Sequence, residues 1–138
     1  MVERKSTNRI IYHHSLTKDG NATSIGRWHT EHNGWEDIGY HFVILKNGEK
    51  QEGRKLSLVG AHAYGKNADS IGVCLIGDFR TEYPTEAQIE TCVKLQHALN
   101  RYYSKNLSIE FHRDLYSPCP GKMLCRKCFV RRLKEGDI

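Results

Sequence analysis

The chain has 138 residues, a mass of 15.9 kDa and a formal net charge of +5. This length fits one ordinary domain, so we expect a single unit over residues 1–138 with its core at about 8–133. Apolar residues make up 38% and charged residues 27%, as in globular proteins, and no apolar run approaches the roughly 20 residues of a membrane-spanning helix. The charge favours anionic partners without choosing among nucleic acid, anionic lipid and acidic wall polymers.

Residues 1–8 lack the apolar stretch of a signal peptide. We therefore expect the protein to be made in the cytoplasm and to reach the cell wall only after release or assisted export. The five cysteines are then expected to be reduced thiols. In such a protein, a cysteine beside proline and glycine favours a metal ligand or a nucleophile over half of a disulfide.

The hydrophobic pattern predicts strands and helices in alternation. In chain order these are a strand over 9–14, a helix over 21–32, a strand over 38–45, a hairpin turn at 46–49, a strand over 70–77, a helix over 85–103, a strand over 107–111 and a helix over 122–133. Thr85 and Gln88 form a capping-box pattern at the start of the long helix. This order predicts an α/β fold in which helices flank both faces of a central mixed sheet.

Several side-chain orientations follow from these elements. His13 and His14 point to opposite faces of their strand, so only one of them can join a site on a given face. Trp28 is expected to point inward from its helix. In the last helix, Cys125 and Cys128 are expected to face the core. The opposite face of that helix is basic and carries Lys122, Arg126, Lys127, Arg131, Arg132 and Lys134.

The segment over 112–121 is the most informative part of the chain. It places His112 directly after a predicted strand, and Cys119 between two prolines that nearly fix its backbone. Together with a histidine of the 13–14 pair, they supply two imidazoles and one sulfur, a ligand set suited to a catalytic zinc ion with one open position. Residue types and spacing leave open which histidine of the pair serves, and whether these are ligands or ordinary strand-end histidines.

Five motifs occur in an order that resembles a known family. They read IIYHHS at 10–15, GYHF at 39–42, GAH at 60–62, SIGVCLIG at 70–77 and HRDLYSPCPG at 112–121. The series is similar to the zinc-dependent N-acetylmuramoyl-L-alanine amidases, which include phage lysozymes of the amidase type and peptidoglycan recognition proteins. The resemblance covers about residues 8–133. It implies the fold of that family, one catalytic Zn²⁺, and hydrolysis of the amide between N-acetylmuramic acid and L-alanine in peptidoglycan, as by a phage or prophage endolysin.

The resemblance also implies roles for single residues. The metal ligands match His13, His112 and Cys119. Tyr40 matches a tyrosine that assists catalysis by a hydrogen bond to the developing oxyanion. Ser117 falls where relatives carry lysine or threonine, so it would act as a catalytic hydrogen-bond donor without a lysine's charge. His62, in the polar loop over 53–69, is expected to line the substrate groove, with a solvated loop position as the alternative.

Two other functions stay open on the sequence alone. The first is a non-catalytic peptidoglycan-binding module, and Cys119 argues against it because such relatives lack the cysteine ligand. The second is a nucleic-acid-binding or polymerase-binding regulator that uses the basic last helix. No motif for reading nucleic acid supports it, so no specific nucleic-acid partner is expected. The expected partner of the monomeric protein is peptidoglycan, with added electrostatic contact between the basic helix and anionic wall polymers or a membrane surface.

Overall fold

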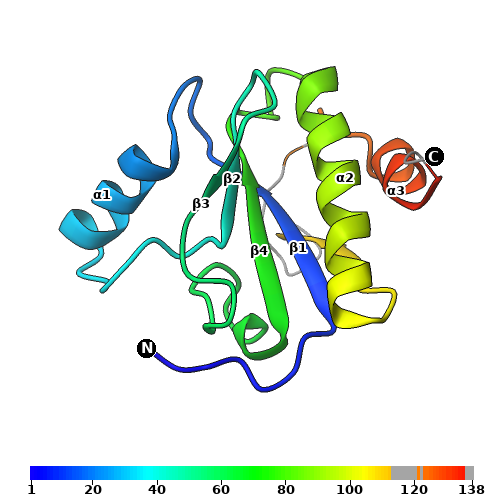
Figure 1. Cartoon of the computed structure of the whole chain (residues 1–138). Coiled ribbons are helices and arrows are strands. Elements are labelled where there is room, and N and C mark those ends of the chain that lie inside the picture. Colours follow the sequence, from blue (N-terminus) through cyan, green and yellow to red (C-terminus); the bar gives the residue numbers. More distant parts are fainter. Residues whose placement is uncertain (113–120, 122, 136–138) are drawn as a thin grey trace.

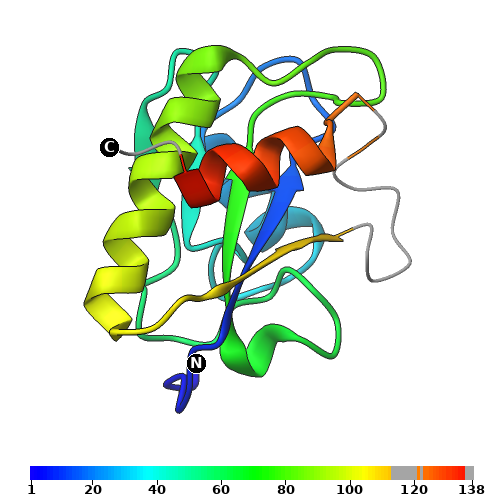
Figure 2. The ribbon, with the colours of Figure 1, turned by 90° about the vertical axis from the view of Figure 1, so that its right-hand side faces the viewer.

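The computed structural model describes residues 1–112, 121 and 123–135, and their elements are shown in Figures 1 and 2. In chain order they are β1 (Arg9–His14), α1 (Ala22–His32), β2 (Phe42–Ile44), β3 (Lys50–Glu52), the 3-10 turn η1 (Asn67–Asp69), β4 (Ser70–Leu75), α2 (Glu86–Tyr103), β5 (Ser108–Phe111) and α3 (Arg126–Glu135). Within these described parts, no helix is both long and apolar enough to cross a membrane.

The strands form one mixed sheet in the order β3-β2-β4-β1-β5. β2, β4, β1 and β5 pair in parallel, and β3 is antiparallel to β2 through the predicted hairpin. Parallel neighbours need long crossover connections, which usually contain helices. Figure 1 shows α1 on one side of the sheet and α2 and α3 on the other, so the predicted fold class is confirmed.

Most of the hydrophobic core lies between the sheet and the α2–α3 layer, the side that faces the viewer in Figure 2. Ile10 and Tyr12 of β1 point into it, and α3 contributes Phe129 and Leu133. The smaller cluster on the α1 side consists of Ile38, Val43 and Ile76. His13 alternates with Tyr12 along β1, so it points to this less apolar side of the sheet.

Local signals place the helix starts of α1 and α2 well. Asn21 caps α1, and Thr85 with Gln88 forms the predicted capping box of α2. The predicted strand over 38–45 is too long, because only Phe42–Ile44 pairs as β2. The backbone of residues 39–41 bonds to loop residues 53, 54 and 61, and the N–H of His41 also bonds to the Gly72 carbonyl of β4. Gly39 comes so close to the Ala61 carbonyl that a Cβ there would collide with it.

Two predicted orientations are wrong. Trp28 is 57% exposed and stacks on His32 with ring centroids 3.8 Å apart, whereas other α1 residues cover the sheet. Cys125 and Cys128 are exposed and joined in a disulfide, so they neither face the core nor exist as reduced thiols in this structure. The reason is that α3 begins at Arg126 and not at 122, so Cys125 precedes the helix, and that the buried face of α3 carries Phe129 and Leu133 but not Cys128.

Candidate active site

His13 and His112 meet at the carboxyl ends of two neighbouring parallel strands. The register of β1 and β5 pairs Tyr12 with Phe111, so the residues that follow them stand side by side. The ring centroids of His13 and His112 are 4.6 Å apart. Open α/β sheets bind their ligands at this edge, so the pair occupies the position where a site is expected.

The structure separates the two consecutive histidines of β1. His14 points to the α2–α3 side, where its ring stacks on Phe79 with centroids 5.4 Å apart. Its Nδ1 accepts the backbone N–H of Phe79 at 2.9 Å. His13 points to the α1 side, toward His112. Of the pair that the sequence left undecided, only His13 therefore faces His112.

A chain of hydrogen bonds behind His13 determines which of its ring nitrogens carries the proton. Ser70 Oγ donates to the carbonyl oxygen of Lys66 at 2.7 Å, so it accepts from Nε2 of His62 at 3.2 Å. Nδ1 of His62 therefore holds a lone pair and accepts from Nε2 of His13 at 2.9 Å. With its proton on Nε2, His13 presents an unprotonated Nδ1, the form of nitrogen that binds a metal ion.

Burial keeps the histidines of the site neutral. His13 is 1% exposed, and desolvation, followed by the nearby imidazoles, holds its pKa well below the ordinary value. Burial likewise lowers the pKa of His62 to about 3 and lowers the pKa of the half-buried His112. Because a neutral imidazole is the ligand form of histidine, this electrostatic environment suits metal binding.

Tyr40 lies on the other side of His13, with ring centroids 5.0 Å apart. The irregular backbone before β2 sets its position, and His29 of α1 supports that backbone by accepting the N–H of Gly39 at 2.9 Å. Tyr40 also lines a groove of about 590 Å³ that runs between α1 and the loop after β1. The other lining residues include Ser15, Leu16, Asp19 and Trp28. The groove therefore borders Tyr40, the residue whose ring lies beside that of His13.

His62 is buried behind His13. It is 8% exposed, and its ring stands edge-on to that of His13 with centroids 5.0 Å apart. Gly72 makes room for it, since a Cβ at that position would come within 2.5 Å of the His62 ring. His62 is therefore not a solvated loop residue. It is also not among the residues that line the groove beside Tyr40.

Comparison with known proteins decides the family. The chain matches the N-acetylmuramoyl-L-alanine amidase family over residues 3–122. It belongs to that family. The sequence is 34% identical over 145 residues to the endolysin of Enterobacteria phage K11, covering 99% of this chain and 92% of that protein.

Solved structures agree with this assignment to the amidase family. The N-acetylmuramoyl-L-alanine amidase LysC from Clostridium intestinale URNW superposes with a TM-score of 0.87 and 32% identity, covering 94% of this chain and 86% of that one. A chain from the complex of peptidoglycan recognition proteins LCa and LCx with tracheal cytotoxin superposes with a TM-score of 0.85 and 30% identity, covering 92% and 84%. The resemblance inferred from the five motifs is confirmed, and the chain is an endolysin-like amidase.

Two predicted site residues of the amidase, Ser117 and Cys119, lie outside the described residues. Their roles as a catalytic donor and a metal ligand stay predictions. Among the residues that are described, no group of three or more histidine, cysteine or acidic side chains could hold a metal ion. The described part of the chain thus contains two of the three predicted ligands, His13 and His112.

The sequence did not reveal the supporting residues of this amidase. Ser70 begins the buried strand β4. The only sign of its role in the sequence is a hydroxyl group directly before a run of mostly apolar residues. His29 is a buried histidine on α1 that touches both Trp35 and Tyr40. Ser70 and His29 could have been identified as polar residues on the buried face of a strand or helix.

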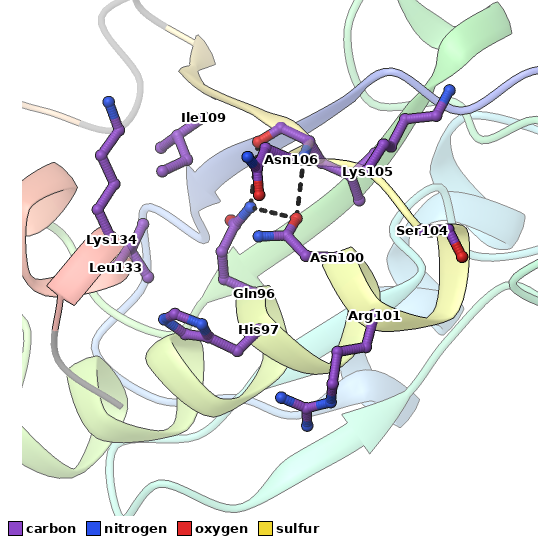
Figure 3. A pocket seen from close by; sticks show the side chains of 11 residues that line it. Gln96, His97, Asn100, Arg101, Ser104, Lys105, Asn106, Ile109, Leu133 and Lys134 are labelled. Carbon is purple, nitrogen blue, oxygen red and sulfur yellow. Dashed lines mark hydrogen bonds between the residues drawn. The ribbon is translucent and has the colours of Figure 1, made fainter. Parts of the chain in front are cut away.

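A larger hollow, of about 810 Å³, lies between the second half of α2, the start of β5 and the end of α3 (Figure 3). Arg101, Lys105 and Lys134 give it a basic lining. Gln96 and Asn100, which also line it, hold the chain at Leu107 through side-chain hydrogen bonds. None of the residues described for the amidase site lines this hollow.

Proposed function

We propose that this protein is a zinc-dependent endolysin that hydrolyses the amide bond between N-acetylmuramic acid and L-alanine in peptidoglycan. The observation that carries the proposal is the convergence of His13, His112 and Tyr40 at one edge of the sheet, in a chain of the amidase family. Relatives named endolysins span nearly the whole chain. By analogy with them, the protein would be made in the cytoplasm and act on the wall after release.

The residues at this edge fit a zinc ion. The hydrogen-bond chain through His62 leaves Nδ1 of His13 unprotonated, and the His112 ring lies beside it. His13, His112 and Cys119 would hold the ion, a set of two imidazoles and one thiolate that leaves one coordination position open. A zinc ion bound in this way supplies Lewis acidity and lowers the pKa of water toward neutrality.

The side chains around the metal ligands divide the remaining tasks. The phenol of Tyr40 would donate a hydrogen bond to the scissile carbonyl oxygen as negative charge develops on it, an interaction whose loss typically costs about 10²–10³ in rate. Ser117 would add a second donor. The groove of about 590 Å³ would receive the muramyl peptide, and the exposed ring of Trp28 at its side offers an apolar face to a sugar or peptide.

The basic face of α3 supports a second contact with the wall. Its exposed cationic residues are Arg126, Lys127, Arg131 and Lys134. Arg132 is engaged in an ion pair with Glu86 at 2.6 Å. Lys134 also borders the basic hollow of Figure 3, which extends the positive surface along α2. We infer that this surface attracts anionic wall polymers, and that binding to isolated walls weakens as salt rises.

The enzymatic proposal is tested with zinc-loaded protein and purified bacterial cell walls. We expect new L-alanine amino termini to appear, to disappear with a chelator and to return when zinc is added back. His13→Ala and Cys119→Ser should abolish both stoichiometric zinc binding and hydrolysis. Intact walls in the presence of fully zinc-loaded protein would rule out the amidase activity. Sedimentation of the protein with those walls would then identify a binding module.

A further inference from the structure

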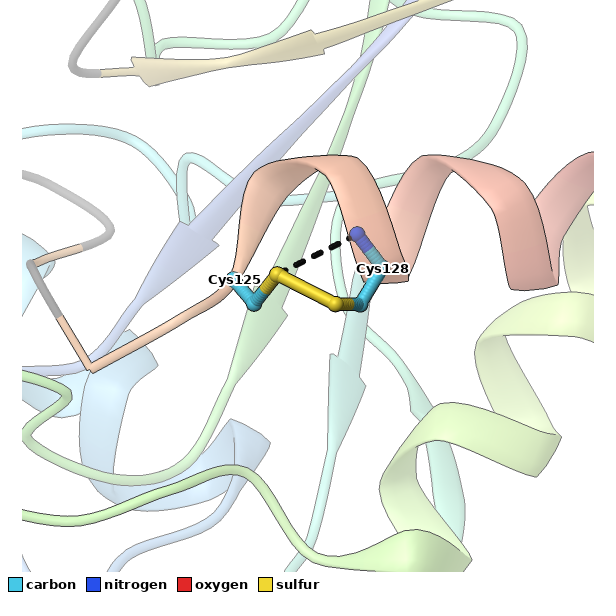
Figure 4. The surroundings of a disulfide bond; sticks show 2 residues. All are labelled: Cys125 and Cys128. Atoms are coloured by element: carbon cyan, nitrogen blue, oxygen red, sulfur yellow. Dashed lines mark hydrogen bonds between the residues drawn. A yellow bond between two sulfur atoms is a disulfide. The ribbon is translucent and has the colours of Figure 1, made fainter.

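Cys125 and Cys128 form a disulfide at the start of α3 (Figure 4). Both residues are exposed, whereas Cys74 and Cys92 are buried and neither is in a disulfide. The proposed wall hydrolysis uses neither residue of the disulfide. The pair is therefore a solvent-accessible, redox-capable group with no assigned role.

The helix start favours a charged sulfur at Cys125. The Cys125 carbonyl accepts the N–H of Phe129 at 2.9 Å, which makes Cys125 the residue that caps α3. Its Sγ accepts the backbone N–H of Cys128 at 3.3 Å, as the dashed line in Figure 4 shows. Arg126 and Lys127 follow directly in sequence. A backbone donor, the positive end of the helix dipole and adjacent cations all stabilise a thiolate relative to a thiol.

A small groove of about 250 Å³ borders the two cysteines. Tyr83, Pro84 and Met123 supply apolar walls, and Arg131 supplies positive charge, whereas the neighbouring Arg132 is paired with Glu86. Tyr83 is 71% exposed, so the groove is open to solvent on that side. Its size and charge suit a small peptide-like molecule that carries carboxylates.

We propose that Cys125 and Cys128 form a thiol–disulfide exchange site for small acidic thiols of the glutathione class. The ligand thiolate attacks Sγ of Cys128, a ligand–Cys128 disulfide forms, and Cys125 leaves as the thiolate that its cap position stabilises. A second ligand thiolate attacks the ligand sulfur of this mixed disulfide and releases the thiolate of Cys128. Two thiols thus give two electrons to the protein disulfide and leave as one oxidised ligand, and the protein thiolates take up protons from solvent.

The redox state of this disulfide affects how firmly the start of α3 is held against the rest of the protein. Phe129 and Leu133 anchor this helix in the main core, and Met123 ties its approach to Phe79 through a backbone hydrogen bond of 2.6 Å. The disulfide closes the first turn between these anchors. Oxidation therefore restrains the start of α3, and reduction leaves that turn held by packing and backbone hydrogen bonds alone. This site does not depend on wall hydrolysis, so it stands or falls separately from the proposed function.

To test this, the protein is equilibrated in buffers with different ratios of reduced to oxidised glutathione. Thiol exchange is then stopped with acid, the protein is unfolded in the presence of a chelator, and its free thiols are alkylated. Two of the five cysteines are in the disulfide, so we expect three alkylated residues in oxidising buffer and five in reducing buffer. Peptide mapping of short incubations should locate the mixed disulfide on Cys128. The oxidised protein should melt a few degrees above the reduced one, and Cys125→Ser/Cys128→Ser should abolish this difference.

The preference for acidic thiols is tested by comparing glutathione with the neutral 2-mercaptoethanol and the cationic cysteamine. After correction for the reactivity of each free thiol, glutathione should reduce the pair severalfold faster. Arg131→Ala should remove most of that advantage and leave the 2-mercaptoethanol rate unchanged. Equal corrected rates for all three thiols would overturn the acidic-ligand assignment. A pair that stays reduced in excess oxidised glutathione, or stays oxidised in excess reduced glutathione, would overturn the exchange site itself.

Discussion

In the proposed zinc site, the position of a single proton on His13 matters, because only an unprotonated ring nitrogen can bind a metal ion. Lys66, Ser70 and His62 form a hydrogen-bond chain in which each group has one role, and the chain ends by placing that proton on Nε2 of His13. Residues behind a metal ligand commonly contribute about 10–100-fold to metal affinity in this way. Ser70 and His62 are thus positioning residues for His13.

Ser70→Ala should weaken zinc binding by about 10–100-fold, because His62 loses the acceptor that fixes its tautomer and can then place its proton on the nitrogen facing His13. Competition with a chromophoric chelator measures this affinity. The matched control is Ser108→Ala, since Ser108 pairs with Arg9 from the opposite side of β1 and is exposed. Equal zinc affinities of the two variants would show that the chain behind His13 does not orient it.

Tyr40→Phe should lower the hydrolysis rate by about 10²-fold and leave zinc affinity unchanged, because it removes only the phenolic donor. The loss should appear in kcat more than in KM, since the bond strengthens as the oxyanion forms. Tyr64→Phe is the control, because Tyr64 is 100% exposed. A fully active Tyr40→Phe enzyme would exclude this role for Tyr40.

At the level of elements, the sequence correctly predicted the features that depend on residues close together in the chain. β1 and the starts of α1 and α2 follow from periodicity and capping residues, and the adjacency of His13 and His112 follows from two strand ends. The short β2 and the late start of α3 depend on contacts from distant loops, such as that of Met123 with Phe79. The contact between Ser70 and His62 could not be predicted from the sequence either, because a serine at the start of a strand gives no sign of its hydrogen-bond partner.

The N-terminus of α2 couples helix stability to the β2–β3 hairpin. Thr85 Oγ1 accepts the N–H of Gln88 at 3.1 Å and donates to the Lys46 carbonyl at 2.6 Å. Thr85→Ala should therefore lower the free energy of unfolding by about 1–2 kcal/mol, with zinc affinity unchanged. Urea denaturation measures this, with the exposed Thr81→Ala as control. Identical midpoints for both variants would contradict the capping role.

At the scale of the whole molecule, we expect buried neutral histidines to contribute to a loss of stability in acid. Nδ1 of His41 accepts the N–H of Gly72 at 3.0 Å, so its proton lies on Nε2 and is donated to the Leu58 carbonyl at 2.8 Å. Burial lowers the pKa of His41 to about 4; the Leu58 carbonyl opposes this shift, and the nearby Arg4 and Arg54 reinforce it. A second proton on this ring would break the bond to Gly72 and charge a buried site.

The pKa of His41 is about 4 in the folded chain and about 6.5 in the unfolded chain, so the unfolded state binds more protons between these values. The free energy of unfolding should therefore fall as pH drops from about 6.5 to about 4, by up to about 3 kcal/mol from this residue, and this contribution should level off below. Urea titrations of metal-free protein across this range measure the slope. His41→Gln should make this slope less steep, and the exposed His32→Gln should leave it unchanged. A slope unchanged by His41→Gln would assign the acid sensitivity to the other buried histidines, because each of them follows the same linkage between protonation and unfolding.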